Sequence, residues 1–552
     1  MTLRRMANDS VHWFVGELTS RIVAESGIPS DRHHLGKILL QSLKDAPDFV
    51  LQIDGATGES ETYASALERT VRCANSLKNL GLQHGDVLIL MAPNHLDVAI
   101  PLYAALYLGV IVAAVDRTLT TNELQHTFAV SQPKIIFCQS DRASDVQLSL
   151  NNLNMDAQIV SFDKGDYLCS FNDFMEQYGD DSPVEDFKCT DFDPEDSPAF
   201  LIATSGTTGL PKAAAVTHKN FAIITPYVWS RYTTFPTPTR LAMIGSPLQW
   251  LTALLNFITS PILRFSRLQT SQNMTQEHAY DLINTYRPTY TIFSPTMMTT
   301  LIKPDERDKC DFTSLELLML GGSAVPQELI NDLKIISPDT EVLNVYGMSE
   351  LSGVAFHGDN PSPGSCGKPM GCFQYRIIDV ETQEDIYEPN VPGELWIKGP
   401  SVFKEYYNNV EATEETFAED RWFKTGDTFY RDENWNFFFV ERIKLLLKYK
   451  SYQISPVEIE AVIRQHPGVL DVAVTGVPDD ECGDLPVACV VPRPGAEPSA
   501  DEIKDWVKES LSDAKQLRGG VLFVDAIPMT ASTKVHRRKL KEMAIEIDKL
   551  EF

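Results

Sequence analysis

Between Glu61 and Leu343 the chain alternates short, almost continuously apolar runs with longer segments of helical polarity. The runs are DVLILMA (86–92), KIIFCQ (134–139), AFLIAT (199–204), RLAMIGS (240–246), YTIFSP (290–295) and LELLMLGG (315–322). Strands of this kind are buried on both faces, as in parallel sheets that are covered by helices. The alternation therefore predicts an α/β domain with two covered, mostly parallel sheets, whose ligands bind at the carboxyl ends of the strands.

The chain changes character twice after this region. Beyond Asn344 the strands are short and separated by glycine and proline, as in CFQYRIIDV (372–380) and GELWIKG (393–399), which predicts a β-barrel-like subdomain. Near Val440 a basic stretch runs into an amphipathic helix and further short strands, which favours a small α+β domain. Because 552 residues exceed one usual core, we expect an N-terminal domain over 1–440, a hinge at 441–444 and a mobile C-terminal domain over 445–552.

Composition excludes several classes of protein. The formal charge of −28 and a pI near 4.8 argue against a nucleic-acid partner, because general electrostatics would repel a polyanion. Nine cysteines without a CxxC pair indicate reduced thiols rather than disulfides or a metal site. No apolar run precedes Asp9, so we expect no secretory signal and an intracellular, cytoplasmic protein. A peroxisomal location stays open, although the final residues lack a Ser-Lys-Leu address.

The stretch from Val98 to Val115 is uncharged for 18 residues, near the lower limit for a membrane span. Pro101 and Gly109 interrupt it, and its second half is β-branched. We therefore interpret it as a buried helix, a turn and a strand, and expect no transmembrane segment.

The stretch LIATSGTTGLPK (201–212) combines an apolar strand with hydroxyls, glycines and one cation. Glycine lets backbone N–H groups approach a ligand closely, so the loop suits an anion with many oxygens, such as phosphate. It is not a Walker loop, because the spacing of glycine and Lys212 differs and Pro211 intervenes. A surface turn after a buried strand is the alternative for this stretch alone.

Four further stretches accompany this loop: YGMSE (346–350), KTGDTFYRDENWNFFFVERIK (424–444), KYKSYQISPVEIE (448–460) and PMTASTKVHRRKL (528–540). In order and spacing the five resemble the core motifs of the acyl- and aryl-CoA synthetases, an adenylate-forming family. The insect luciferase and 4-coumarate:CoA ligase branch is the most similar in wording. Such enzymes attack the α-phosphate of ATP with a carboxylate and then pass the acyl group to coenzyme A.

The resemblance implies a role for each matching residue. The β- and γ-phosphates would lie on Thr204, Ser205, Gly206, Thr207, Thr208, Gly209 and Lys212, and the remaining nucleotide contacts would come from Gly321, Gly322, Ser323, Asn344, Tyr346, Gly347, Met348, Ser349, Asp427 and Arg442. Glu350 would hold Mg²⁺ as a hard oxygen ligand. Lys534 would bridge the carboxylate and the α-phosphate, Lys444 would be the hinge residue, and Lys448 would act in the second half-reaction.

Three glycines that are common in the family are replaced, by Ala213, Ser451 and Thr533. Where the glycine has a positive φ, a side chain there costs on the order of 1 kcal/mol. Ser451 lies near the expected path of the thiol, so the resemblance implies adenylation more firmly than thioester formation.

Trp250 and Leu320 are the expected lining of the acid pocket. Some fatty acyl-CoA synthetases place an aromatic gate at such a position, so we expect a medium- to long-chain fatty acid as the substrate. We expect an AMP-forming acid–thiol ligase that uses ATP, Mg²⁺ and coenzyme A. An aryl-propenoate ligase, a luciferase-type monooxygenase and a non-catalytic binder are the alternatives, and oligomeric state cannot be inferred.

Overall fold

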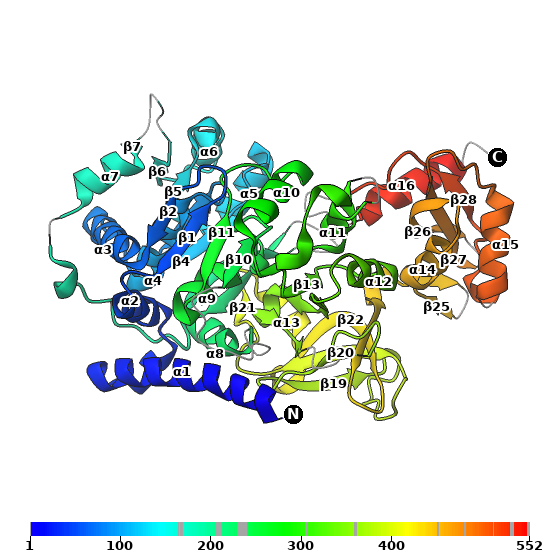
Figure 1. Ribbon diagram of the computed structural model, residues 1–552, viewed down its shortest axis with the longest axis horizontal. Coiled ribbons are helices and arrows are strands. Elements are labelled where there is room, and N and C mark those ends of the chain that lie inside the picture. The colour runs from blue at the N-terminus through cyan, green and yellow to red at the C-terminus, as the bar shows by residue number, and fades with distance from the viewer. Residues whose placement is uncertain are drawn as a thin grey trace.

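The computed structural model describes residues 2–163, 165, 169–180, 182–204, 211–228, 240–303, 306–357, 362–449, 452–479, 482–511, 513–529 and 535–548. Its two large sheets have parallel cores (Figure 1). The first runs β14 (Glu341–Val345), β13 (Leu317–Gly321), β12 (Tyr290–Phe293), β10 (Leu241–Ile244), β11 (Ser266–Gln269), β1 (Val50–Asp54) and β2 (Ser60–Thr62). The second runs β21 (Glu405–Tyr406), β9 (Lys212–Thr217), β8 (Pro198–Thr204), β4 (Ile111–Ala114), β3 (Val87–Met91), β5 (Pro133–Cys138), β6 (Gln158–Ser161) and β7 (Cys169–Ser170).

Every apolar run that predicted a strand forms one, and the predicted α/β architecture is confirmed. The second sheet departs from parallel pairing at one edge, where β9 runs antiparallel to β8 and Thr204 faces Lys212. The phosphate loop expected over 204–212 therefore connects two neighbouring antiparallel strands. Residues 205–210 of that loop lie outside the described residues.

Helices cover both sheets, and one buried cluster joins α3, α4 and α9 to strands of each. The helices of the N-terminal domain are α1 (Thr2–Ser26), α2 (Leu35–Asp45), α3 (Tyr63–Leu80), α4 (Ala99–Leu108), α5 (Thr121–Ser131), α6 (Ala143–Asn152), α7 (Phe171–Tyr178), α8 (His218–Val228), α9 (Leu251–Leu263), α10 (Gln276–Tyr286), α11 (Pro295–Leu301), α12 (Gln327–Ile336) and α13 (Val410–Thr416). The long first helix, α1, was not predicted from the sequence. It buries Val11, Leu18 and Ile22 and leaves Trp13 71% exposed.

The uncharged stretch 98–115 forms α4, a left-handed turn at Gly109 (φ +69°) and β4, as the sequence predicts. A Cβ at Gly109 would lie 2.6 Å from side-chain atoms of His84 and Phe192, so this turn has no room for a side chain. No helix among the described residues is long and apolar enough to cross a bilayer.

The expected barrel-like subdomain is a four-stranded antiparallel sheet in the order β19 (Gln374–Ile378), β20 (Gly393–Lys398), β22 (Phe423–Arg431) and β23 (Phe437–Arg442). Two short pairs precede it, β15 (Gly347–Met348) with β16 (Gly353–Val354) and β17 (Phe356–His357) with β18 (Lys368–Pro369). The expected hinge, 441–444, covers the end of β23 and the start of a 3₁₀ turn, Ile443–Leu445. Its role as a hinge stays a prediction.

The C-terminal segment forms the expected α+β unit at one end of the molecule (Figure 1). Its sheet runs β25 (Tyr452–Ile454), β24 (Leu447–Tyr449), β27 (Gly483–Pro492) and β26 (Val469–Asp479), with β28 (Gly520–Phe523) parallel to β27. The helices are α14 (Pro456–Arg464), α15 (Ala500–Ser510) and α16 (Arg537–Asp548). Ile459, Ile463 and Val507 are among the residues that give this unit a core of its own.

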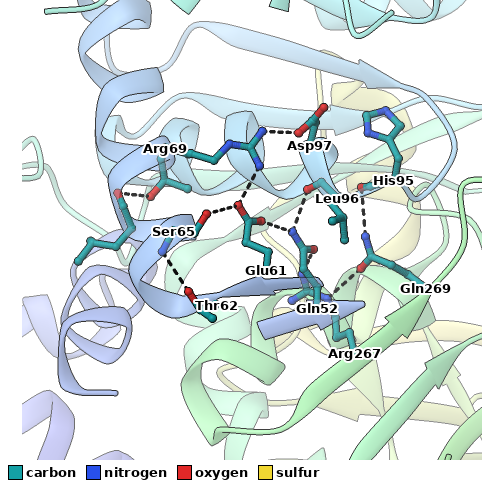
Figure 2. Close-up of polar contacts among 12 residues, drawn as sticks. Gln52, Glu61, Thr62, Ser65, Arg69, His95, Leu96, Asp97, Arg267 and Gln269 are labelled. Atoms are coloured by element: carbon teal, nitrogen blue, oxygen red, sulfur yellow. Dashed lines mark hydrogen bonds and ion pairs between the residues drawn. The ribbon is translucent and has the colours of Figure 1, made fainter. Parts of the chain in front are cut away.

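A buried polar network joins the two large sheets beside the loop that follows β3 (Figure 2). Arg267 on β11 has no exposed surface and donates hydrogen bonds to the side chains of Gln52, Gln269, Tyr103 and Ser260. The amides of Gln52 and Gln269 donate in turn to the backbone carbonyls of Leu96 and His95, at 2.9 and 3.1 Å.

The loop that follows β3 also contacts the loop that follows β10, through the side chain of Asn94. Its side chain donates to the Ser246 carbonyl and accepts from the Leu248 N–H. The loop after β10, which leads to Trp250, is therefore held against the second sheet.

Candidate functional site

Three sheets come together at the carboxyl end of β14. The segment from Tyr346 to Glu350, which follows β14, contacts β22 of the four-stranded sheet and β21 of the second large sheet. Tyr346 follows β14 of the first sheet and contacts Asp427 on β22, while Glu350 contacts Tyr406 on β21 of the second sheet. The predicted YGMSE motif is thus the junction of three sheets. It lies at the strand edge where an α/β fold binds its ligands.

Asp427 is the centre of one half of the site. It is 1% exposed, and it lies on β22 opposite Arg442 of β23. The Tyr346 hydroxyl donates to one carboxylate oxygen at 2.6 Å, and Nε of Arg442 lies 3.1 Å from the other.

The same charges set the electrostatics of this half. Asp427 raises the pKa of the Arg442 guanidinium, and burial together with Asp427 raises the pKa of the Tyr346 phenol. Both groups therefore keep their protons at neutral pH. Rings of Phe356, Phe429 and Phe439 surround Tyr346, with centroids 5.9, 4.7 and 6.4 Å away, so its ring is fixed by packing.

The other half of the site contains Glu350, Tyr406 and Lys212. Glu350 is 5% exposed, and the Tyr406 hydroxyl donates to its Oε1 at 2.8 Å. Nζ of Lys212, at the start of β9, lies 5.0 Å from the centre of the Tyr406 ring. Tyr406 thus connects the cation of the predicted phosphate loop to the predicted metal ligand.

Burial raises the pKa of the Glu350 carboxyl, and the hydrogen bond from Tyr406 partly opposes this. A nearby cation would restore the carboxylate form. Among the described residues no three His, Cys, Asp or Glu side chains are arranged to hold a metal ion. One buried carboxylate suits Mg²⁺, which takes few protein ligands and completes its octahedron with phosphate oxygens and water.

Glycines let neighbouring strands approach closely along one side of the site. A Cβ at Gly321 would lie 2.8 Å from the Val345 carbonyl oxygen on β14, and Gly322 has a positive φ of +89°. Ser323 is exposed beside them, and the Asn344 side chain donates to the Gly364 carbonyl at 3.5 Å. Gly347 and Met348 form β15, and Ser349 begins the turn that carries Glu350.

The two predicted pocket residues differ in environment. Trp250 is half-buried and is the N-cap residue of α9, whereas Leu320 has no exposed surface and belongs to the core around β13. Several predicted residues lie outside the described residues, namely Ser205, Gly206, Thr207, Thr208, Gly209 and Lys534. Lys444 lies in the turn after β23 and Lys448 in β24, and only their backbone is described.

Sequence reasoning missed Tyr406. The sequence offered no reason to pair a tyrosine after position 400 with Lys212 and Glu350. The available signal was an aromatic pair, Tyr406 and Tyr407, directly before Asn408 and Asn409. Thr425 was missed as well, and its hydroxyl accepts from the Asp427 N–H at 3.1 Å.

The family assignment comes from two profiles that match the chain. The profile of the AMP-binding enzyme family covers residues 40–407, and that of the AMP-binding enzyme C-terminal domain covers residues 458–534. The chain belongs to the AMP-binding enzyme family. The predicted resemblance is therefore confirmed. The expectation of an AMP-forming acid–thiol ligase is confirmed at the level of the family.

Relatives of this AMP-binding enzyme carry two kinds of name. Luciferin 4-monooxygenase of Photuris pensylvanica is 33% identical over 522 residues, with 91% of this chain and 93% of that protein covered. 4-Coumarate-CoA ligase 1 of Narcissus pseudonarcissus is 30% identical over 526 residues, with 93% and 94% covered. The crystal structure of ATP-bound MatB from Rhodopseudomonas palustris shares the fold, with a TM-score of 0.83 at 24% identity and 92% and 99% of the two chains covered.

Proposed function

We propose that this AMP-binding enzyme activates a carboxylic acid with ATP and transfers the acyl group from the adenylate to coenzyme A. The observation that carries the proposal is the junction at Tyr346 to Glu350. There one short segment brings a carboxylate–arginine pair, a second buried carboxylate and a lysine from three different sheets to one strand edge. Such a constellation suits a ligand with a ribose, phosphates and a metal ion.

Each described residue has a physical task in this proposal. The Asp427 carboxylate accepts hydrogen bonds from the ribose hydroxyls, while Arg442 fixes its orientation at 3.1 Å and adds positive charge. Tyr346 presents its packed ring to the base, beside the close backbone at Gly321 and Gly322. Lys212 stabilises charge on the departing pyrophosphate, because adenylation concentrates negative charge in its transition state.

Glu350 would hold Mg²⁺, which would neutralise phosphate charge when bound. The Tyr406 hydroxyl keeps this carboxylate oriented, since it donates to Oε1 from a position that the β21–β9 pairing fixes. Lys534 and Lys448 are proposed for the adenylation and thioester steps respectively. Thr204 and the five residues that follow it complete the phosphate loop.

A medium- to long-chain fatty acid is the proposed substrate. Trp250 stands after β10 at the start of α9, and Asn94 fixes the loop that leads to it. A half-buried indole at a strand end offers an apolar surface at the entrance to a channel for an acyl chain. An aryl-propenoate is the second candidate, and it is favoured by the likeness to the 4-coumarate ligase.

The deciding experiment is mass spectrometry of the products formed with ATP, Mg²⁺, coenzyme A and a panel of short, aryl, medium-chain and long-chain acids. Acyl-CoA from a subset of chain lengths supports the proposal. Acyl-adenylate without acyl-CoA would show that the enzyme catalyses only the first half-reaction with these acids. Glu350→Gln should abolish both products. Lys219→Ala is the matched control, because that lysine pairs with Glu195 on the surface, away from the site.

A luciferase-type oxygenation is the alternative, and the 33% identity to luciferin 4-monooxygenase favours it. It shares the adenylate and then consumes oxygen. Light emission with luciferin and ATP, in the absence of coenzyme A, would assign the chain to that reaction.

A further inference from the structure

Glu441 is a buried carboxyl group at the seam between the last sheet of the N-terminal domain and the C-terminal unit. It precedes Arg442 near the end of β23 and is 3% exposed. Its Oε1 accepts from the Arg442 backbone N–H at 2.8 Å, and its Oε2 is buried without a hydrogen-bond partner among the described residues. A buried acceptor without a partner is costly, and more so when it carries charge.

Charged groups face Glu441 from each element packed around it. Arg537 of α16 and Glu460 of α14 come from the C-terminal unit, Asp427 comes from β22, and Arg442 follows on its own strand. Helix α14 packs directly against β23, and the Ser455 hydroxyl before it donates to the Val440 carbonyl at 3.4 Å. The C-terminal unit thus contributes to the burial of Glu441 at this seam.

The positive charge of Arg537 partly opposes the pKa increase that burial causes at Glu441, but Arg537 also serves a second carboxyl group. Its Nη1 donates to Glu460 Oε1 and to the Val474 carbonyl, both at 2.7 Å. Glu460 also accepts from the Val474 N–H at 2.8 Å. The C-terminal unit therefore places beside Glu441 a second carboxyl group and an arginine that is hydrogen-bonded to it. Burial outweighs the charge of Arg537 and raises the pKa of Glu441 to about 7.

We propose that Glu441 positions the C-terminal unit in a proton-dependent way: the neutral carboxylic acid holds the unit against β23, and the carboxylate releases it. Ionised Glu441 needs water or a cation, and it gains water when α14 and α16 move away from β23. The neutral form tolerates burial and can donate a hydrogen bond. The inference rests on the proposed function in one respect only, namely that movement of this unit at the hinge separates the two half-reactions.

The sign of the pH dependence follows from linkage. With the unit against β23 the pKa of Glu441 is about 7, whereas an exposed glutamate has an ordinary pKa of about 4.3. The docked arrangement binds more protons, so it is most populated below the exposed pKa. Its ratio to the released arrangement falls by up to about tenfold per pH unit as the pH rises toward 7, and levels off above that.

The test is single-molecule energy transfer on the full chain, with dyes on unnatural amino acids at Tyr387 and Leu470. These side chains lie on the two sides of the seam and are 74% and 51% exposed. Wild type should lose the high-transfer population as the pH rises from about 4.3 to about 7. Glu441→Gln is a neutral isostere and should keep that population at every pH. Glu433→Gln, an exposed glutamate in the β22–β23 turn, is the matched control and should behave as wild type.

A wild-type population that does not change with pH, or a Glu441→Gln profile that still does, would overturn the proposal. The unfolding midpoint of each variant shows whether a flat profile comes from a damaged fold. The energy-transfer measurement needs neither the carboxylic acid substrate nor catalytic turnover. Its outcome is therefore independent of whether the chain forms acyl-CoA. The pH profiles of pyrophosphate exchange and of thioester formation then connect the position of the C-terminal unit with the two half-reactions. The ratio of their rates should lose its pH dependence in Glu441→Gln.

Discussion

Replacing Arg267 by methionine tests the buried network that joins the two large sheets. Arg267→Met keeps most of the aliphatic volume and removes the guanidinium, which is fully buried. The Tyr103 hydroxyl still donates to the Phe257 carbonyl at 2.6 Å, but the side-chain oxygens of Gln52 and Gln269 lose their donor. Their amide nitrogens stay engaged with Glu61 and the backbone of the 94–97 loop, so neither amide can turn over to repair the loss.

Each orphaned buried acceptor costs about 1–3 kcal/mol, so the two together cost about 2–6 kcal/mol. Removal of a buried cation offsets part of this, because its desolvation is no longer required. We expect a net loss of about 3 kcal/mol in the free energy of unfolding, which lowers the urea midpoint by that loss divided by the slope of the transition.

The assay is urea unfolding followed by tryptophan fluorescence, with the midpoint of the N-terminal domain's transition as the readout, because a two-domain chain has no single free energy of unfolding. Arg264→Met is the control. Arg264 is partly exposed and lies 3.4 Å from Asp45, so its loss should cost about 0–1 kcal/mol. Equal midpoints for the two variants would refute the reasoning, because the network would then be no stronger than a surface pair.

Outcomes are expected for four further variants. Asp427→Asn should lower ATP affinity roughly 10- to 100-fold in calorimetry, since hydrogen bonds to a charged group contribute about 1.5–3 kcal/mol, and unchanged affinity would remove Asp427 from the nucleotide site. Gly36→Ala should destabilise the protein by about 1–3 kcal/mol, because the new Cβ would lie 2.3 Å from the Leu106 carbonyl oxygen, whereas Gly16→Ala in the open middle of α1 should stabilise it by about 0.5–1 kcal/mol; a urea midpoint that rises for Gly36→Ala, or one that falls for Gly16→Ala, would contradict the corresponding expectation. Trp250→Ala should shift the ratio of long-chain to short-chain acyl-CoA in a competition assay by roughly 10-fold, and an unchanged ratio would separate this indole from the acyl channel.

The parallel core was predictable because strands that are buried on both faces need apolar side chains at nearly every position. The resulting continuous apolar runs can be recognised from the local sequence alone. The pairing of β9 was not predictable, because its sequence KAAAVT has no feature that distinguishes parallel from antiparallel neighbours. Helix α1 escaped prediction because its apolar positions are sparse and are mixed with charges, so only its contacts with the domain show which face is buried.

The candidate site divides in the same way. Tyr346, Glu350, Asp427 and Arg442 were found through motifs whose spacing is local, and the structure brings them together. Tyr406 could not be found through a local motif. Its partners, Glu350 and Lys212, lie 56 and 194 residues away in the sequence and meet it only after three sheets have assembled.

The placement of β21 bears on how the chain reaches its native state during synthesis. The edge of β9 that continues from the predicted phosphate loop is covered only when Glu405 and Tyr406 pair with Ala215 and Ala214. On the ribosome this edge stays open while nearly two hundred further residues emerge, and an unpaired edge strand is a template for aggregation. Late closure by β21 thus leaves this hairpin with an unprotected edge until Glu405 and Tyr406 have been synthesised. It also means that a chain truncated before Glu405 would retain the strands of the hairpin without the strand that protects them.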